Sequence, residues 1–220
     1  GGDDHGGGDH GGNLPQPHVD MAAAYDVYHG VGYYARRYPG PNHACLTLLE
    51  RTLAAAGPRL LDFGCGDGRY AAPLLDRTSA SILAYDISHV AAEELAARCP
   101  REVSAGRLHI VCAGNDDLVR AAEPASFDVA AAMFGVLGHI EGRAARLEAL
   151  SAMRRLLRPG GRLVATAPNA RRRFHAEQAA AKPLIEAGEL EPGDILYARE
   201  ADGVHVDLYY HLYQPGELED

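Results

Sequence analysis

The chain has 220 residues, of which 47% are hydrophobic, so it is long enough to bury a core and is most simply one folded domain. Its formal net charge of −9 argues against broad nucleic-acid binding. No apolar run approaches the roughly 18 to 20 residues that span a bilayer, and no secretory signal is visible, so the sequence predicts a cytoplasmic protein without a membrane segment.

The first residues predict a flexible tail. Residues 1–12 are only Gly, Asp and His, which cannot build a core, so we expect a tail at 1–19 and one domain at 20–220. His5 and His10 could hold a metal, but a solvated tail is the simpler interpretation. Scattered cysteines without C-x-x-C spacing predict reduced, mostly buried thiols, and neither zinc nor disulfides: Cys45, Cys65, Cys99 and Cys112. We therefore expect no metal.

Residues 21–38 contain five tyrosines, of which Tyr25 and Tyr28 would share a helix face. The segment is either a helix whose rings belong to the core or a lid over a ligand with a cationic centre, because tyrosine faces attract cations. Next, Asn42 predicts the N-cap of a helix that ends at Gly57-Pro58.

Residues 59–77 read as a buried strand, a glycine loop and a helix. Gly64, Gly66 and Gly68 would let a ligand approach the backbone, and the helix start would suit a polar or anionic group, although an ordinary strand-to-helix turn has the same pattern. A dinucleotide site has G-x-G-x-x-G, whereas this loop is G-x-G-x-G followed by Arg69, so a nicotinamide or flavin ligand ranks second.

Three acids at this edge favour another kind of ligand. Asp62 precedes the loop, Asp67 lies within it, and Asp86 ends the next strand, residues 81–86. They suit a ligand with a free amino group, a cationic centre and a ribose, because ligands of open α/β sheets bind at the carboxyl ends of the strands. The alternative is that Asp86 caps the helix that begins near Ser88.

Two further strands are expected at residues 108–113 and 127–134. The loop after the second, residues 135–140, would face the reacting centre by the same strand-end argument. Its His139 could take a proton from a hydroxyl or amine, because a histidine titrates near neutral pH; a structural histidine bonded to the backbone is the competing interpretation.

Residues 141–157 predict a helix with Leu147, Leu150, Met153 and Leu157 on one face, followed by a stop at 158–161 and a strand at 162–167. Apolar and polar residues alternate in 194–199 and in 204–213, on either side of Asp202-Gly203, and this pattern predicts a β-hairpin. Nine of the eleven tyrosines lie in this hairpin region or in the segment 21–38, so we expect the two to meet over the active site and line the acceptor pocket. Nine arginines between residues 143 and 173 would be a solvated face or would bind an anionic acceptor.

At this point the chain resembles the class I S-adenosylmethionine-dependent methyltransferases over about residues 21–168. The resemblance lies in Leu61-Asp62-Phe63-Gly64-Cys65-Gly66-Asp67-Gly68, in Asp86, and in the Leu-Arg-Pro-Gly-Gly turn at 157–161. It implies a Rossmann-like α/β fold: a mostly parallel sheet with helices on both faces, here with an antiparallel hairpin and an N-terminal helical lid. It also implies a further helix and two strands after residue 220, unless the hairpin takes their place at the sheet edge.

The resemblance implies S-adenosyl-L-methionine as the cofactor and favours the lid interpretation. The family has Gly-Asp after the third strand, where this chain has Gly114-Asn115-Asp116, so either residue 115 or 116 would read the adenine. The expected cofactor contacts are Tyr25, Tyr33, Arg37, Asp62, Gly64, Cys65, Gly66, Asp67, Gly68, Asp86, Ile87, Asn115, Asp116 and Phe134. The expected acceptor contacts are Tyr34, Val136, Arg173 and Tyr210, with His139 as candidate base.

The predicted activity is methyl transfer from S-adenosyl-L-methionine to an oxygen or nitrogen of a small-molecule acceptor. One alternative acceptor is tRNA, because residues 208–213 with Gly216-Glu217-Leu218 resemble wobble-uridine tRNA methyltransferases. Another class of function is a catalytically silent domain that binds the cofactor as a partner subunit. The sequence leaves the oligomeric state open.

Overall fold

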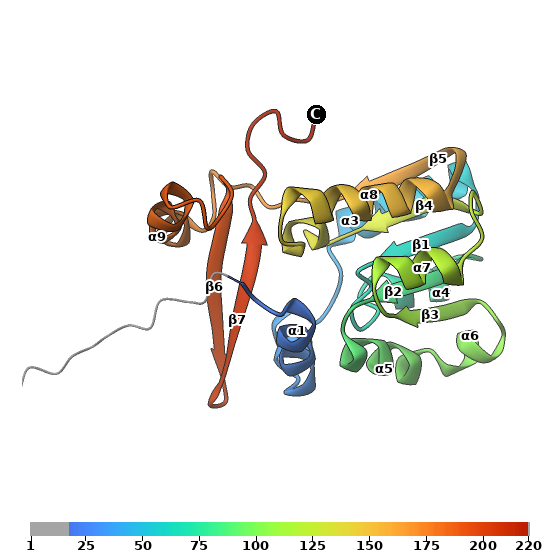
Figure 1. The fold of residues 1–220 in the computed structure, drawn as a ribbon. Helices are drawn as coiled ribbons and strands as arrows, with labels where there is room; N and C mark the ends of the chain where they lie inside the picture. The colour runs from blue at the N-terminus through green and yellow to red at the C-terminus, as the bar shows by residue number, and fades with distance from the viewer. Residues whose placement is uncertain (1–17, 220) are drawn as a thin grey trace, which may run out of the picture.

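A computed structural model describes residues 18–219. Its centre is a sheet of five parallel strands in the order β3-β2-β1-β4-β5 (Figure 1). The strands are β1 (Arg59–Phe63), β2 (Ser81–Asp86), β3 (Leu108–Cys112), β4 (Phe127–Ala132) and β5 (Leu157–Ala165). Because the chain winds outward in opposite directions from β1 and β4, the carboxyl ends of these two strands form the switch point where such sheets bind ligands.

Helices cover both faces of the sheet, as predicted. Side chains of neighbouring strand residues point to opposite faces, so Leu60 packs under α3 (His43–Ala56), α4 (Ala71–Arg77) and α5 (His89–Arg98). Leu61 packs under α7 (Asn115–Ala121) and α8 (Arg143–Leu156) on the other face. Asn42 caps α3 by accepting a hydrogen bond from the Cys45 amide, which confirms the predicted helix start.

The hairpin forms a separate antiparallel sheet of β6 (Asp194–Ala201) and β7 (Val204–His211). Asp202 and Gly203 both have positive φ, which is what a two-residue loop of this twist needs. The hairpin pairs with no strand of the five-stranded sheet, so the structure contradicts the alternative in which it takes the place of edge strands there. Figure 1 shows it beside the sheet, with α9 (His175–Glu186) on its outer side.

The N-terminal segment forms two helices, α1 (Met21–Gly30) and α2 (Tyr33–Arg37). The first lies between β7 and α5, and its Met21 packs with Val206, Leu208 and Tyr209. This confirms that the two tyrosine-rich regions meet. None of the helices in the described part of the chain is long and apolar enough to cross a membrane.

One predicted helix face is only partly right, and one predicted boundary is wrong. Met153 is buried on α8 and Leu150 and Leu157 pack against the same core as predicted, but Leu147 is 52% exposed, and Arg146, Ala149 and Leu156 complete the buried face. Strand β5 begins at Leu157 rather than at residue 162. Leu157 pairs with Phe127 and Arg162 with Val129, so the Pro-Gly-Gly segment is an irregularity within the strand and not a turn before it.

Three further elements were not predicted: α6 (Pro100–Ser104), α7 and α9. The loop after β4 contains a short 3₁₀ helix, η1 (Val136–His139).

Candidate functional site

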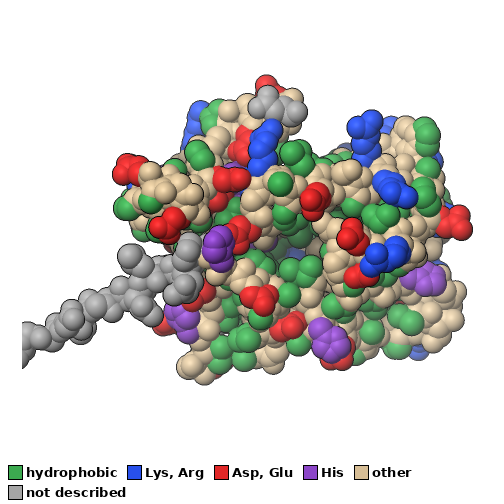
Figure 2. Space-filling view, in the orientation of Figure 1, with side chains coloured by type: hydrophobic (Ala, Val, Ile, Leu, Met, Phe, Trp, Pro, Cys, Tyr) green, Lys and Arg blue, Asp and Glu red, His purple; other side chains and the backbone are tan. Residues whose placement is uncertain are grey.

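A cavity of about 430 Å³ lies at the carboxyl edge of the parallel sheet. Figure 2 shows a hollow there, near the middle of the face, with hydrophobic side chains at its edge. The strand ends and following loops contribute Phe63, Gly64, Gly66, Tyr85, Asp86, Ile87, Gly114, Asn115, Met133, Phe134, Val136, His139, Ile140, Glu141 and Ala145. The N-terminal segment covers it with Val19, Met21, Tyr25, His29 and Tyr34. The lid residues and the strand ends therefore enclose one space.

The glycine loop has the backbone that only glycine takes easily. Gly64 has a φ of +78°, and a Cβ there would lie 2.2 Å from Cγ2 of Val136. At Gly66, with a φ of +54°, a Cβ would meet nothing nearer than His29, 3.9 Å away. The loop thus packs tightly where it meets the sheet and is open where it faces the cavity.

Asp86 holds this loop in place. Its Oδ2 accepts a hydrogen bond from the Gly66 amide at 2.7 Å, and its Oδ1 accepts one from the Ser88 amide at 2.8 Å. Burial raises the pKa of the Asp86 carboxyl, although these two amides oppose the shift. Ser88 itself caps α5, so the carboxylate both orders the helix start and faces the cavity.

Asp62 lies beneath the loop and not on the cavity wall. It is 2% exposed, and its Oδ2 has no hydrogen-bond partner among the described residues. Burial, and secondarily the charge of Asp86, raises the pKa of the Asp62 carboxyl to about 7. A buried acceptor without a donor is costly. Asp62 therefore suits a ligand that brings a positively charged donor to the loop.

The lid helix α1 is tied down next to Asp86. Asp26 on α1 accepts hydrogen bonds from Ser88 Oγ at 2.7 Å and from the Val90 amide at 3.2 Å, which satisfies donors at the start of α5. Tyr25, on the same helix, packs edge-on against His139 with ring centroids 5.6 Å apart. The lid is thus fixed by one carboxylate and closes the cavity with an aromatic ring.

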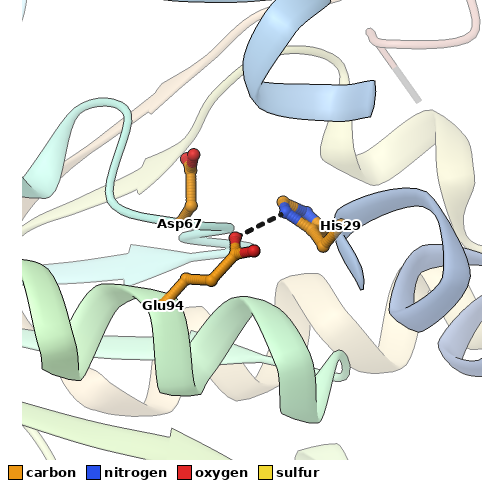
Figure 3. A group of neighbouring side chains, drawn as sticks. All are labelled: His29, Asp67 and Glu94. Atoms are coloured by element: carbon orange, nitrogen blue, oxygen red, sulfur yellow. Dashed lines mark hydrogen bonds and ion pairs between the residues drawn. The ribbon is translucent and has the colours of Figure 1, made fainter. Parts of the chain in front are cut away.

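His29, Asp67 and Glu94 form a further contact between the lid and the core (Figure 3). His29 is 3% exposed, and its Nδ1 lies 3.3 Å from Oε2 of Glu94 on α5. The possible ligand atoms of His29, Asp67 and Glu94 lie within 4.8 Å of one another, so the three side chains could hold a cation. The sequence did not predict this group. Asp67 belongs to this group and does not line the cavity.

A second such set is Glu191, Asp194 and His211 under the hairpin. It is filled by hydrogen bonds: Asp194 Oδ1 accepts from Tyr209 at 2.7 Å and from His211 at 2.6 Å, and Glu191 accepts from Arg146 at 2.6 Å. This network fixes the hairpin to α8, so Arg146 belongs to the interior and not to a solvated face.

His139 lies in the cavity wall and is neutral at working pH. Its ring stacks on Tyr210 with centroids 4.1 Å apart, and its Nδ1 donates to the Tyr209 carbonyl at 3.0 Å, which leaves Nε2 free to accept a proton. Burial lowers the pKa of the imidazole to about 4. The expectation that this histidine titrates near neutral pH is therefore wrong.

The structure brings ten of the predicted residues together on the cavity wall: Tyr25, Tyr34, Gly64, Gly66, Asp86, Ile87, Asn115, Phe134, Val136 and His139. Nine others do not line it: Tyr33, Arg37, Asp62, Cys65, Asp67, Gly68, Asp116, Arg173 and Tyr210. Of the two candidates after β3, Asn115 is on the wall and accepts a hydrogen bond from Tyr85, while Asp116 is exposed. The metal candidates His5 and His10 lie outside the described residues.

Several wall residues were missed. His29 follows Tyr25 by four residues, so helical spacing alone would have placed both on one face. Phe63 and Tyr85 end the strands beside the glycine loop and Asp86, where the strand-end rule also applies. Ile140 belongs to the loop 135–140 that the strand-end rule had placed at the reacting centre, whereas no such signal marks Val19, Met21, Glu141 and Ala145.

Comparison with known proteins supplies the family. A family model described as a methyltransferase domain matches residues 61–163. Residues 61–163 are therefore a methyltransferase domain, which agrees with the predicted cofactor S-adenosyl-L-methionine. Among curated proteins, no relative of the chain was found.

Solved structures share the fold of this methyltransferase. A SAM-dependent methyltransferase from Methanosarcina mazei is 20% identical, with 73% of this chain and 74% of that one covered and a TM-score of 0.58. The CcbJ methyltransferase from Streptomyces caelestis is 17% identical, with 91% and 85% covered and a TM-score of 0.63. The [4+2]-cyclase SpnF is 21% identical, with 80% and 73% covered and a TM-score of 0.54. At these identities the likeness concerns the fold, and the acceptor must be argued from the site.

The methyltransferase site fits its cofactor on three observations. A buried carboxylate oxygen of Asp62 lacks a donor, Gly66 leaves the loop open to a ligand, and Asp86 ends β2 at the cavity. A ligand with an ammonium group, a cationic sulfur and a ribose supplies the donors and the charge that this acidic edge lacks.

Proposed function

We propose that this methyltransferase transfers a methyl group to an oxygen or nitrogen of a small-molecule acceptor. The observation that carries the proposal is the enclosed cavity, which the lid residues Tyr25 and Tyr34 share with the strand ends. A pocket of a few hundred Å³ lined by aromatic rings suits a small ligand. The bound cofactor supplies an electrophilic methyl group on a positively charged sulfur.

The residues of the chain then have three tasks. We propose that Asp62 and the backbone of Gly64 and Gly66 hold the methionine part, Asp86 the ribose, and Ile87 and Asn115 the adenine. Closure of the lid excludes water and keeps the acceptor in line, which is the main contribution that a protein makes to such a transfer.

A proton leaves the acceptor when it is a hydroxyl or a protonated amine. We propose His139 as the group that receives it, through Nε2, because the Nδ1 donor is already used by the Tyr209 carbonyl. With an imidazole pKa of about 4, the acceptor form of His139 is fully present above about pH 5.

The experiment is methyl transfer from tritiated cofactor into a cell extract separated into small molecules, RNA and protein. We expect label in the small-molecule fraction, with a rate that is flat between pH 6 and pH 8. His139→Gln should lower kcat about 10-fold to 100-fold without weakening S-adenosylhomocysteine binding, and His109→Gln, an exposed histidine on β3, is the matched control. Label in the tRNA fraction alone would replace the small acceptor, and no label in any fraction would favour a silent cofactor-binding subunit.

A further inference from the structure

Four arginines stack on aromatic rings at the junction of the lid and the hairpin. Arg37 lies over Tyr38 at 5.6 Å, and Arg69 lies over Tyr38 at 5.3 Å and over Phe134 at 4.2 Å, measured from Cζ to the ring centroids. Two more pairs come from the C-terminal region: Arg199 over Tyr197 at 4.6 Å, and Arg173 over Phe174 at 5.6 Å. Arg37 also donates to the hydroxyls of Tyr38 and Tyr33, and Arg199 to the Ala198 carbonyl. A guanidinium has five N–H donors, so donors remain on each of these side chains for a ligand.

Most of these rings are packed against one another. Phe174 lies 5.6 Å from Tyr197 and 5.8 Å from Tyr210, centroid to centroid. Tyr210 in turn packs against Gly135, where a Cβ would lie 1.8 Å from its hydroxyl oxygen, and Gly135 follows Phe134 directly. The arginines therefore surround one aromatic surface, and Phe134 is both part of that surface and part of the cavity wall.

These four arginines have no carboxylate partner among the described residues, unlike several others. Arg36 pairs with Asp202, Arg146 with Glu191 and Arg158 with Asp128. Arg69 donates from Nε to the Gly40 carbonyl at 2.7 Å, but its NH1 is buried without any hydrogen-bond partner in the described chain. A buried, unsatisfied cationic donor is costly unless a ligand completes it.

We propose that Arg37, Arg69, Arg173 and Arg199 bind the carboxylate or phosphate of the acceptor, and that the rings between them hold its planar or apolar body. This inference rests on the proposed function, since it names the chemical class of the acceptor. Guanidinium groups bind carboxylate and phosphate through paired N–H donors. The site gathers four cationic groups on a protein whose net charge is −9, and one of them, Arg69, lies next to the cavity residue Phe134.

A small anionic molecule fits better than an RNA strand. The free NH1 of Arg69 is buried beside Phe134, at the cavity end of the surface. A small anion reaches a buried N–H group more readily than a phosphodiester backbone that lies on the surface, and the neighbouring Phe134 lines the cavity.

The test uses calorimetry to measure how tightly matched probes bind to the full chain saturated with S-adenosylhomocysteine. Benzoate and phenyl phosphate carry the anion, and benzyl alcohol is the neutral aromatic control. We expect both anions to bind at least tenfold more tightly than benzyl alcohol. Arg69→Gln, Arg173→Gln and Arg199→Gln should each weaken the anions about fivefold to tenfold and leave benzyl alcohol unchanged. Arg101→Gln, an exposed arginine on α6, is the control and should change nothing.

Equal binding of the three probes would overturn the proposal, as would anion binding that survives in the three arginine variants. Because Arg173 is exposed and Arg199 half-buried, their variants keep the test valid where Arg69→Gln fails to fold. Tight, salt-sensitive binding of a single-stranded RNA oligonucleotide through the same arginines, with no affinity for either small anion, would reject the small acceptor. S-adenosylhomocysteine binding is measured first, so failure of the cofactor site is seen separately.

Discussion

Asp62 offers the sharpest test of how the cofactor edge is built. The pKa of its carboxyl rises from 3.8 to about 7, chiefly because the group is buried. Between about pH 4 and pH 7 the folded chain keeps a proton that the unfolded chain releases, so the free energy of unfolding falls as pH rises through this range. A shift of about 3 units at about 1.36 kcal/mol each gives a loss of about 4 kcal/mol, complete above pH 7.

Asp62→Asn removes this loss because the amide does not ionise. In urea unfolding at pH 5 and pH 8, the unmodified protein should lose about 3 kcal/mol more than the variant does on going to the higher pH, because only about 2 pH units of this range lie above pH 5. Asp76→Asn, an exposed aspartate on α4, is the matched control and should behave as the unmodified protein does. If the free energy of unfolding falls by the same amount in the unmodified protein and in Asp62→Asn, the raised pKa of a buried Asp62 carboxyl without a donor is refuted.

The same residue should report the cofactor. If an ammonium group completes Asp62, binding of S-adenosylhomocysteine favours the ionised carboxylate and releases about half a proton near pH 7. Calorimetry in phosphate and in Tris buffers measures this release, because the two buffers differ in ionisation enthalpy. Asp62→Asn should bind more weakly and release none, and an unchanged proton release in the variant would place the effect elsewhere.

Three other changes test the parts that close the cavity. Asp26→Ala leaves donors at the start of α5 unpaired and should cost about 1 to 2 kcal/mol in urea unfolding, with weaker S-adenosylhomocysteine binding; retained affinity would show that the lid does not depend on this carboxylate. Gly64→Ala should abolish cofactor binding in calorimetry, because its Cβ overlaps Val136. Its control is Gly106→Ala, which also has positive φ but open space around the Cβ and should lower the free energy of unfolding by only about 1 kcal/mol. Equal effects of the two variants on binding and on unfolding would argue against the close packing at Gly64. Arg146→Met should lower the free energy of unfolding in urea by about 3 to 5 kcal/mol, because it breaks the buried pair with Glu191, and Arg154→Met should change it almost not at all. A mild effect of Arg146→Met would mean that the buried network does not hold the hairpin.

Much of the sheet could be predicted because its signals are local. The runs at 81–86 and 127–132 are apolar, short and ended by Gly, Asp or Ser, which favours buried strands. Helix α7 was missed because its first turn is Asn115-Asp116-Asp117, which is typical of a loop, and it buries little besides Leu118. Helix α9 was missed because it follows a run of arginines and contains Pro183.

The site residues also separate into those that local sequence patterns predict and those that depend on tertiary packing. Strand-end residues such as Asp86 and Asn115 could be predicted, since the carboxyl ends of parallel strands share one edge. Arg146 could not, because its burial depends on Glu191 and Tyr209, which lie 45 and 63 residues away. The neutrality of His139 has the same origin: sequence gives the ordinary pKa of an imidazole, and only tertiary packing gives the burial that lowers it.

The two sides of the cavity have different sources in the chain. The cofactor side consists of the ends of β1, β2 and β3, which lie within the matched residues 61–163. The lid helices and the hairpin, which we propose to contact the acceptor, lie outside that range and are joined by an apolar cluster of their own and by polar contacts to the core. We therefore expect substitutions in the hairpin to change the acceptor without disturbing the methyl donor, whereas lid substitutions such as Asp26→Ala affect both. This separation explains why the fold identifies the cofactor, whereas the acceptor has to be inferred from residues such as Arg69 and Arg199.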